Sequence, residues 1–376
     1  MQKPFVFGVP VDDEHFIGRE IEQERLRANF QHGINTILLS PRRWGKTSLV
    51  KKIAQEVSSK RLIVVYVDAF SCRNEYDFYN RLASDVLRQT SSQIEEWKEQ
   101  AKGFIERLTP KISISADPAS AYSVSLGITP KTHTPQEILN LPEQIASRKK
   151  CQIVICIDEF QQIGEFSESL SIQRTMRSVW QHHKNVSYCL FGSKMHMMIE
   201  MFQKKSFPFF KFGDILYLDN IPTETWIPYI RTQFQKEQKD ISPSYAEKIC
   251  HLVNNHSSYV QQLAWLTLLN TKTETTECAF QTAVMELVEQ NAAIFTQQTE
   301  SLTTYQMNFL RALIDDVTKD FGLESIRETY QLGSASNIVR LKRSLLEKEL
   351  IEITDKGIFL ADPVLKLWLK KLFSNG

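Results

Sequence analysis

A glycine, a lysine and two hydroxyl residues stand together at Gly45-Lys46-Thr47-Ser48, a short loop after an apolar run. The run at 36–39 predicts a β-strand, and a helix is expected from Ser48 to Val57. A strand, a tight turn and a helix N-terminus bring backbone N–H groups together, which favours an anion. Gly45 lets the backbone approach a phosphate, Lys46 reaches the β- and γ-phosphates, and the Thr47 hydroxyl takes one position on Mg²⁺.

Two adjacent carboxylates, Asp158 and Glu159, end the apolar run 153–157. Such a run predicts a strand buried on both faces of a parallel sheet. Ligands bind at the carboxyl ends of these strands, so we expect Asp158 to hold Mg²⁺ with Thr47, and Glu159 to polarise the attacking water. Gly-Lys-Thr alone also occurs by chance, and Asp-Glu alone is typical of a solvated turn. Together the two motifs predict ATP hydrolysis with Mg²⁺.

Composition restricts the class of protein. At 376 residues the chain suits two or three compact units. The formal net charge of +1 gives no global field to attract nucleic acid or an anionic membrane. The six cysteines have no metal-site spacing, which is typical of a reduced, cytoplasmic protein. The chain opens without a signal peptide and contains no apolar stretch near the ~20 residues of a membrane span.

Apolar runs alternate with helical patterns through the first part of the chain, which predicts an α/β fold with a parallel sheet over residues 1–222. The predicted strands lie at 36–39, 61–68, 153–158, 186–193 and 214–218. Strict alternation around a proline turn predicts a β-hairpin insertion at about 103–133, which decorates the sheet or contacts a partner. Helices alone follow from 223 to 300, which predicts a small all-α unit. Three helices and a hairpin at 301–376 predict a winged helix.

These motifs resemble the archaeal-type P-loop ATPases, a family in the STAND-related branch of AAA+ proteins that is also widespread in bacteria. The resemblance covers essentially the whole chain. The residues that carry it are Phe16-x-Gly18-Arg19, the string from Pro41 to Leu49, Ile157-Asp158-Glu159-Phe160, Phe191-Gly192-Ser193, and Asp362-Pro363 with Trp368-Leu369.

The resemblance implies a role for each matching residue. It places Gly45 to Ser48 on the phosphates, Asp158 on Mg²⁺ and Glu159 as the catalytic carboxylate beside Lys46. Ser193 becomes the sensor at the end of the neighbouring strand. Phe16 and Arg19 are expected on the adenine side, and the all-α unit at 223–300 becomes the lid. The remaining loop residues are counted with the nucleotide site: Arg42 and Arg43 contact phosphates or lie at a solvated tip, and Trp44 packs over the loop.

Three features depart from the family pattern. Ser40 replaces the first glycine of the Walker A pattern, which requires an ordinary φ at that position. Lys211 stands where such proteins often carry an arginine that points at a neighbour's γ-phosphate, and Arg174 and Arg177 are other candidates for that role. The segment 255–262 contains no arginine, so a second sensor of the usual type is not visible. The last two features favour weak basal turnover.

Three functions remain open from the sequence. The leading hypothesis is a Mg²⁺-dependent ATPase whose nucleotide state moves the lid and the winged helix. The second is a slow nucleotide-gated signalling switch or scaffold, acting with a homo-oligomeric or protein partner. The third is ATP-dependent DNA binding by the helix 336–349. That helix carries Arg340, Lys342, Arg343 and Lys348, although a core helix with a solvated face explains it equally well.

Overall fold

The computed structural model describes residues 3–91 and 134–374. The chain divides into two compact units. The sheet unit comprises Arg19–Asp219, and the helical unit comprises Met1–Gly18 with Asn220–Gly376. The hairpin predicted at about 103–133 lies outside the described residues. The expected domain limits at 222 and 300 stay predictions.

The sheet unit is built on five parallel strands in the order β2-β3-β4-β1-β5. Its strands are β1 (Thr36–Leu39), β2 (Leu62–Asp68), β3 (Gln152–Asp158), β4 (Val186–Phe191) and β5 (Asp214–Tyr217). Every residue of β1 and β4 is buried, as expected where helices cover both faces. The predicted α/β fold with a parallel sheet is confirmed. The order brings the ends of β1, β3 and β4 to one edge of the sheet.

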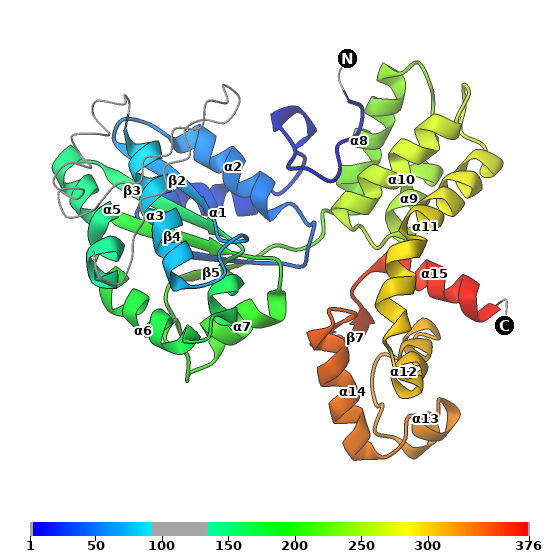
Figure 1. Ribbon diagram of the computed structural model, residues 1–376. Helices are drawn as coiled ribbons and strands as arrows, with labels where there is room; N and C mark the ends of the chain where they lie inside the picture. The colour runs from blue at the N-terminus through cyan, green and yellow to red at the C-terminus, as the bar shows by residue number, and fades with distance from the viewer. Residues whose placement is uncertain (1–2, 92–133, 375–376) are drawn as a thin grey trace, which may run out of the picture. The chain divides into compact units, whose positions relative to one another are not determined.

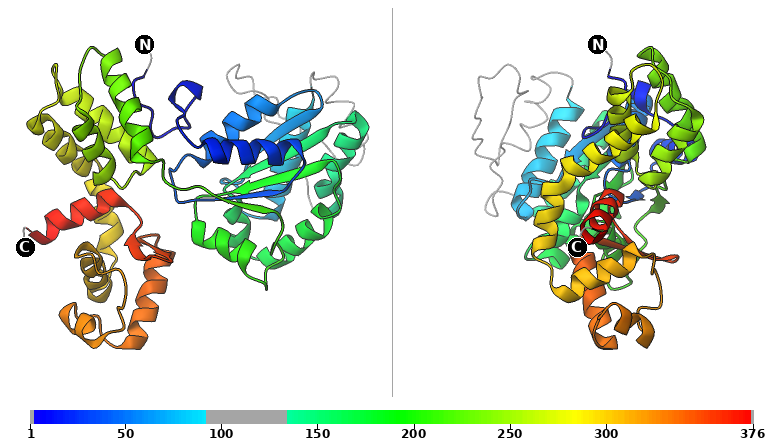
Figure 2. Two further views of the ribbon diagram at one scale, coloured as in Figure 1. Left: turned by 180° about the vertical axis from the view of Figure 1, so that it is seen from behind. Right: turned by 90° about the vertical axis from the view of Figure 1, so that its right-hand side faces the viewer.

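Helices cover both faces of this sheet. Figure 1 views the sheet from the side of α3, and the reverse view in Figure 2 shows α1 in front of the strands. The helices are α1 (Glu20–Gln31), α2 (Lys46–Val57), α3 (Glu75–Thr90), α5 (Pro135–Lys149), α6 (Ser169–Trp180) and α7 (Met195–Gln203), with a 3₁₀ turn η2 (Phe160–Glu165). A capping box of Thr134 and Glu137 opens α5, with Pro135 in its first turn. Helix α7 has no counterpart among the predicted elements.

The helical unit contains a helical segment followed by a winged helix. The first elements are η1 (Asp13–His15), α8 (Thr223–Lys236), α9 (Pro243–Leu252), α10 (Ser257–Asn270) and α11 (Glu277–Glu300). The winged helix comprises α12 (Thr304–Ile314), α13 (Glu324–Thr329), α14 (Ala335–Glu347), β6 (Ile351–Thr354), β7 (Gly357–Leu360) and α15 (Pro363–Ser374). The predicted winged helix is confirmed.

One buried apolar cluster continues through the helical unit, from Trp226 on α8 to Leu369 on α15. Asp362 reinforces this connection, because its Oδ1 accepts the backbone N–H of Val364 at 2.8 Å and so caps α15. Its Oδ2 accepts the Tyr259 hydroxyl of α10 at 2.6 Å. The Asp-Pro pair near the end of the chain therefore joins the winged helix to the helical segment. No helix in the described part of the chain is long and apolar enough to cross a membrane.

Gly213 lies directly before β5, where the chain packs closely against the residue that precedes β1. A Cβ at this position would lie 2.2 Å from the backbone oxygen of Asn35, and Asp214 N–H already donates to that oxygen at 2.8 Å. We expect Gly213→Ala to lower the free energy of unfolding by roughly 1–3 kcal/mol. The measurement is the urea unfolding midpoint.

Gly322→Ala is the matched control, because nothing in the described residues lies within 4 Å of a Cβ there. Its unfolding midpoint should equal that of the parent or rise slightly. Equal midpoints for both variants would contradict this reading of β5.

Candidate functional site

The loop between β1 and α2 has the backbone that an anion site needs. Gly45 lies directly before α2 with φ of 93°, a conformation that favours glycine. A Cβ at Gly45 would meet nothing within 4 Å among the described residues, so the space before the helix N-terminus is open there. Ser40 is not among the residues with positive φ. A serine therefore fits where the Walker A pattern has its first glycine.

Lys46 is a buried cation with neutral partners. Its Nζ donates to the Ser40 carbonyl at 2.8 Å, the Pro41 carbonyl at 2.6 Å and the Ser40 hydroxyl at 3.2 Å. Burial lowers the pKa of Lys46 to about 8, and the carboxylates of Glu159 and Asp158 only partly oppose this. A phosphate would give this cation the negative partner that the loop carbonyls lack.

Thr47 and Asp158 meet although 111 positions separate them in the sequence. The Thr47 hydroxyl donates to Asp158 Oδ2 at 2.9 Å, and the Tyr66 hydroxyl donates to the same oxygen. The backbone N–H of Glu159 donates to Oδ1 at 2.9 Å. Because the Thr47 hydroxyl donates its hydrogen bond to Asp158, the lone pairs of Thr47 Oγ1 remain available for a cation. These hard oxygen donors fit Mg²⁺.

Burial shapes the acid–base properties around Asp158. It raises the pKa of the Asp158 carboxyl, while the hydrogen bonds from Tyr66 and Thr47 work in the opposite direction. Burial also raises the pKa of the Tyr66 phenol, with the Asp158 charge adding to the effect. Tyr66 therefore stays a hydroxyl donor at neutral pH.

Glu159 follows β3 with φ of 54°, and its side chain contacts the end of β4. Its Oε2 accepts the Ser193 hydroxyl at 2.8 Å and the Ser193 N–H at 3.3 Å. The Gln161 side-chain amide donates to the same oxygen. Gly192 leaves room for this arrangement, because a Cβ there would lie 1.7 Å from Gln161 Oε1. Gly192 and Ser193 therefore position Gln161 and Glu159.

Arg19 binds backbone in the sheet unit. Its guanidinium donates to the carbonyls of Asp219 at 2.9 Å and Trp44 at 2.7 Å. Burial lowers the pKa of Arg19 to about 10. This side chain fastens the phosphate loop to the residues that follow β5. Phe16 belongs to the helical unit, where it ends η1, so the expected contacts of Phe16 and Arg19 with adenine stay predictions.

The other loop residues differ in exposure. Arg42 and Arg43 are exposed, and Arg43 has φ of 60°. Trp44 is half-buried, and Ser48 is buried in the first turn of α2. Their contacts with nucleotide stay predictions. Ser48 lies on the helix whose N-terminus faces the loop.

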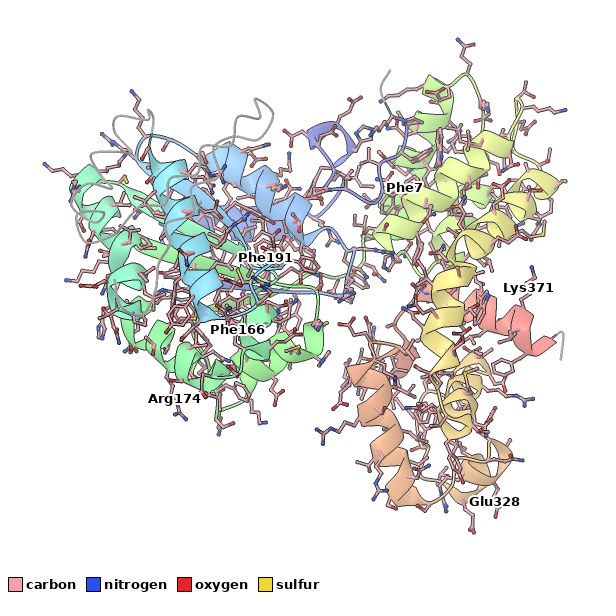
Figure 3. All side chains as sticks on the ribbon, viewed as in Figure 1. Phe7, Phe166, Arg174, Phe191, Glu328 and Lys371 are labelled. Atoms are coloured by element: carbon pink, nitrogen blue, oxygen red, sulfur yellow. The ribbon has the colours of Figure 1, made fainter. Side chains whose placement is uncertain are left out.

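The cations considered for a neighbour's γ-phosphate lie at different places on the sheet unit. Lys211 is exposed, with Nζ 5.6 Å from the Phe210 ring centre. Arg174 points outward from α6, as Figure 3 shows. Arg177 lies over the Phe212 ring at 4.8 Å. Lys211 and Arg174 are thus open to a partner, while Arg177 is engaged with the aromatic core.

Sequence reasoning missed two residues of the site. Tyr66 lies in an apolar strand, and its hydroxyl gives no signal in the sequence because its partner lies on another strand. Gln161 stands two positions after Glu159, and an amide so close to a carboxylate is the signal that could have found it. For Tyr66 the sequence spacing does not reveal the contact.

Helix α14 of the winged helix has one buried face, formed by Ile338, Leu341 and Leu345. Arg340 and Arg343 lie on its exposed side with Val339, which is 69% exposed. Three cations here have local partners: Arg343 pairs with Glu347 at 2.8 Å, Lys342 lies over the Phe321 ring, and Lys348 contacts Ser301.

The parallel sheet and the geometry of the phosphate loop define an α/β P-loop NTPase. The sequence matches, over residues 16–263, the family described as the ATPase domain predominantly from Archaea. The chain belongs to this family. Residues 293–371 match a second family, described as a probable winged helix domain.

Solved structures share this fold. The Walker-type ATPase PABY2304 of Pyrococcus abyssi is 16% identical, with a TM-score of 0.71 over 98% of this chain and 100% of that chain. The ORC2 protein of Aeropyrum pernix, solved as ADPNP–ADP complexes, is 15% identical, with a TM-score of 0.57 over 97% of each chain. At such identities the likeness shows the fold. No curated protein matches the sequence.

The buried Lys46 predicts a proton linkage. Since the pKa of Lys46 lies near 8, about half of the nucleotide-free molecules lack this proton at pH 8, and a bound phosphate restores it. We expect ADP binding to take up close to one proton at pH 9 and much less at pH 7. The affinity for ADP should therefore fall as the pH rises from 7 to 9. Calorimetric titration in two buffers of different ionisation enthalpy measures the uptake.

Lys46→Arg is the control, because a guanidinium stays charged throughout this range. It should bind ADP without the pH-dependent uptake. Equal uptake by the variant and the parent would assign the proton to another group.

Proposed function

We propose that this chain binds Mg²⁺·ATP at the loop 40–48 and hydrolyses it. The observation that carries the proposal is the hydrogen bond between Thr47 and Asp158. It unites the residue after the phosphate-binding lysine with the carboxylate at the end of β3. Membership of an ATPase family supports the same function.

The phosphate contacts come from the start of α2. The backbone N–H groups of residues 45–48 and the positive end of the helix attract the phosphates. Lys46 exchanges the carbonyls of Ser40 and Pro41 for the β- and γ-phosphate oxygens. Arg42 and Arg43 add positive charge at the exposed rim of the loop.

Thr47 and Asp158 would hold Mg²⁺, with Thr47 Oγ1 as a direct ligand and Asp158 acting through coordinated water. When bound, the ion neutralises charge on the phosphates. The carboxylate keeps the Thr47 proton directed away from the ion, which preserves the Thr47 lone pairs for coordination.

Glu159 is the proposed base. Ser193 and Gln161 hold its Oε2, which fixes the carboxylate and leaves Oε1 to accept a proton from the attacking water. Ser193 follows β4 and senses the γ-phosphate through this contact. The reaction is thereby confined to the edge where β1, β3 and β4 end.

A slow nucleotide-gated switch is the second candidate. It is favoured by Lys211, which stands in the place of an arginine, and by the segment 255–262, which contains no arginine, because both features predict weak basal turnover. In this scheme the nucleotide state biases the arrangement of the helical segment 223–300 and the winged helix 301–376. An exposed cation such as Lys211, supplied by a second copy or a protein partner, would raise the rate.

DNA binding is a third candidate, favoured by one observation on α14. Ser336, Val339, Arg340 and Arg343 form an exposed stripe with helical spacing opposite its buried face. A helix with such a stripe can enter a major groove. The near-neutral charge of the whole chain leaves any attraction to DNA to this local surface.

Two substitutions separate binding from turnover. Lys46→Ala should weaken ATP binding roughly tenfold or more, because a charged hydrogen-bond donor is lost. Glu159→Gln should bind ATP like the parent and lower kcat by about 10²-fold or more. Nucleotide affinity and phosphate release are measured on the same preparations.

Glu165→Gln is the control for Glu159→Gln, since it removes a nearby carboxylate that pairs with Lys194. Its turnover should match that of the parent. Normal hydrolysis by Glu159→Gln would refute the role given to that residue. A kcat near ~10 s⁻¹ for the protein alone, typical of enzymes, would count against the switch.

The DNA hypothesis predicts a steep salt dependence. Affinity for duplex DNA should fall as salt rises, and Arg340→Ala with Arg343→Ala should reduce the logarithmic slope by up to about 0.9 for each DNA phosphate that the variant no longer neutralises. Replacing Lys370 and Lys371 of α15 by alanine removes the same charge elsewhere on the winged helix and should leave the slope unchanged. Salt-independent binding, or equal changes of slope in both double variants, would reject α14 as the DNA-contacting element.

A further inference from the structure

The side chain of Tyr66 on β2 reaches a site residue at the end of β3. Tyr66 lies on β2, where its register partner on β3 is Cys156, two residues before Asp158. Its hydroxyl nevertheless donates to Asp158 Oδ2, the oxygen that also accepts the Thr47 hydroxyl. One carboxylate oxygen thus receives two hydroxyl donors from two different elements.

The backbone of Tyr66 is fixed at the edge of the sheet. Because β2 is an edge strand, its outward N–H and C=O groups need partners other than a strand. Gln89 of α3 supplies both: its Oε1 accepts Tyr66 N–H at 2.8 Å, and its Nε2 donates to the Tyr66 carbonyl at 2.8 Å. The amide of Gln89 acts here as a short piece of an additional strand.

The ring of Tyr66 is held from two further sides. Lys51 Nζ of α2 lies 5.3 Å from the ring centre, within the range of a cation–π interaction. The Phe191 ring at the end of β4 lies 6.2 Å away. Figure 3 shows Phe191 within the sheet unit among the strands. Backbone, ring and hydroxyl of Tyr66 are therefore all constrained.

We propose that Tyr66 is a positioning residue for the metal, acting through Asp158. This inference rests on the proposed function, since Asp158 and Thr47 are the residues proposed to hold Mg²⁺. With Glu159 N–H on Oδ1 and two hydroxyls on Oδ2, the carboxylate has one orientation. In that orientation the Thr47 hydroxyl proton points toward Asp158, and the lone pairs of Thr47 Oγ1 point toward the ion.

The alternative is that Tyr66 only fills space beside β3. Tyr66→Phe distinguishes the two roles, because it keeps the ring and its contacts and removes only the hydroxyl. A space-filling role predicts no effect on metal affinity. A positioning role predicts a loss that depends on Mg²⁺.

The test measures ADP affinity with Mg²⁺ titrated and with EDTA, so it does not depend on turnover. We expect Tyr66→Phe to bind ADP in EDTA as the parent does. Its half-saturating Mg²⁺ concentration should rise roughly tenfold or more, as is typical when a partner of a metal ligand is removed.

Tyr188→Phe is the matched control. Tyr188 is a buried tyrosine on β4 whose hydroxyl contacts His183 Nδ1 at 2.9 Å, so it loses the same group within the same sheet. Its Mg²⁺ dependence should equal that of the parent. Gln89→Leu, which removes the backbone partner of Tyr66, should shift the Mg²⁺ dependence in the same direction as Tyr66→Phe and remains informative if Tyr66→Phe fails to fold.

The outcomes separate this inference from the proposed function. If the parent protein binds no nucleotide, or binds it equally with Mg²⁺ and EDTA, the proposed function fails. If the parent responds to Mg²⁺ and Tyr66→Phe responds identically, the positioning role alone is overturned. An equal loss of ADP affinity in Mg²⁺ and EDTA would likewise overturn it, because that result indicates a structural role.

Discussion

The hydrogen bond from the Thr47 hydroxyl to Asp158 Oδ2, 2.9 Å long, sets the geometry on which the site depends. Thr47 lies in the first turn of α2, behind β1, while Asp158 ends β3, and β4 separates those two strands. The bond forms only if all three strands run parallel and end at the same edge. The buried runs of β1, β3 and β4, the helices on both faces and the loop that turns at Gly45 serve to place these two oxygens together.

Charge explains why the same edge is suited to a ligand. Lys46 is buried against carbonyl oxygens, and Asp158 is largely removed from water beside it. A buried charge without an opposite partner is costly, and this cost would fall in the proposed complex with phosphates and a divalent ion. Arg19 holds the loop through the Trp44 carbonyl, so the loop is fixed without a ligand.

Local patterns in the sequence predicted much of this arrangement. The five apolar runs became the five strands, and the Thr134 capping box opens α5, because burial and capping are encoded in neighbouring residues. The contacts that complete the site come from elements distant in sequence. The Tyr66 hydroxyl of β2 reaches Asp158 on the neighbouring strand β3, and Gln161 fits only because Gly192 lacks a side chain. Helix α7 escapes prediction because the residue before it, Lys194, makes no side-chain cap, so the sequence offers no clear start signal for a helix.

Lys46, Thr47 and Asp158 are proposed to form a Mg²⁺-nucleotide site. A crystal structure of the full chain with Mg²⁺ and a non-hydrolysable ATP analogue is the direct test. Lys46 Nζ should then lie on β- and γ-phosphate oxygens instead of the Ser40 and Pro41 carbonyls, and the metal should lie on Thr47 Oγ1 with Asp158 behind a coordinated water. A nucleotide bound elsewhere, or a loop that keeps its Lys46 contacts at saturating ligand, would contradict it.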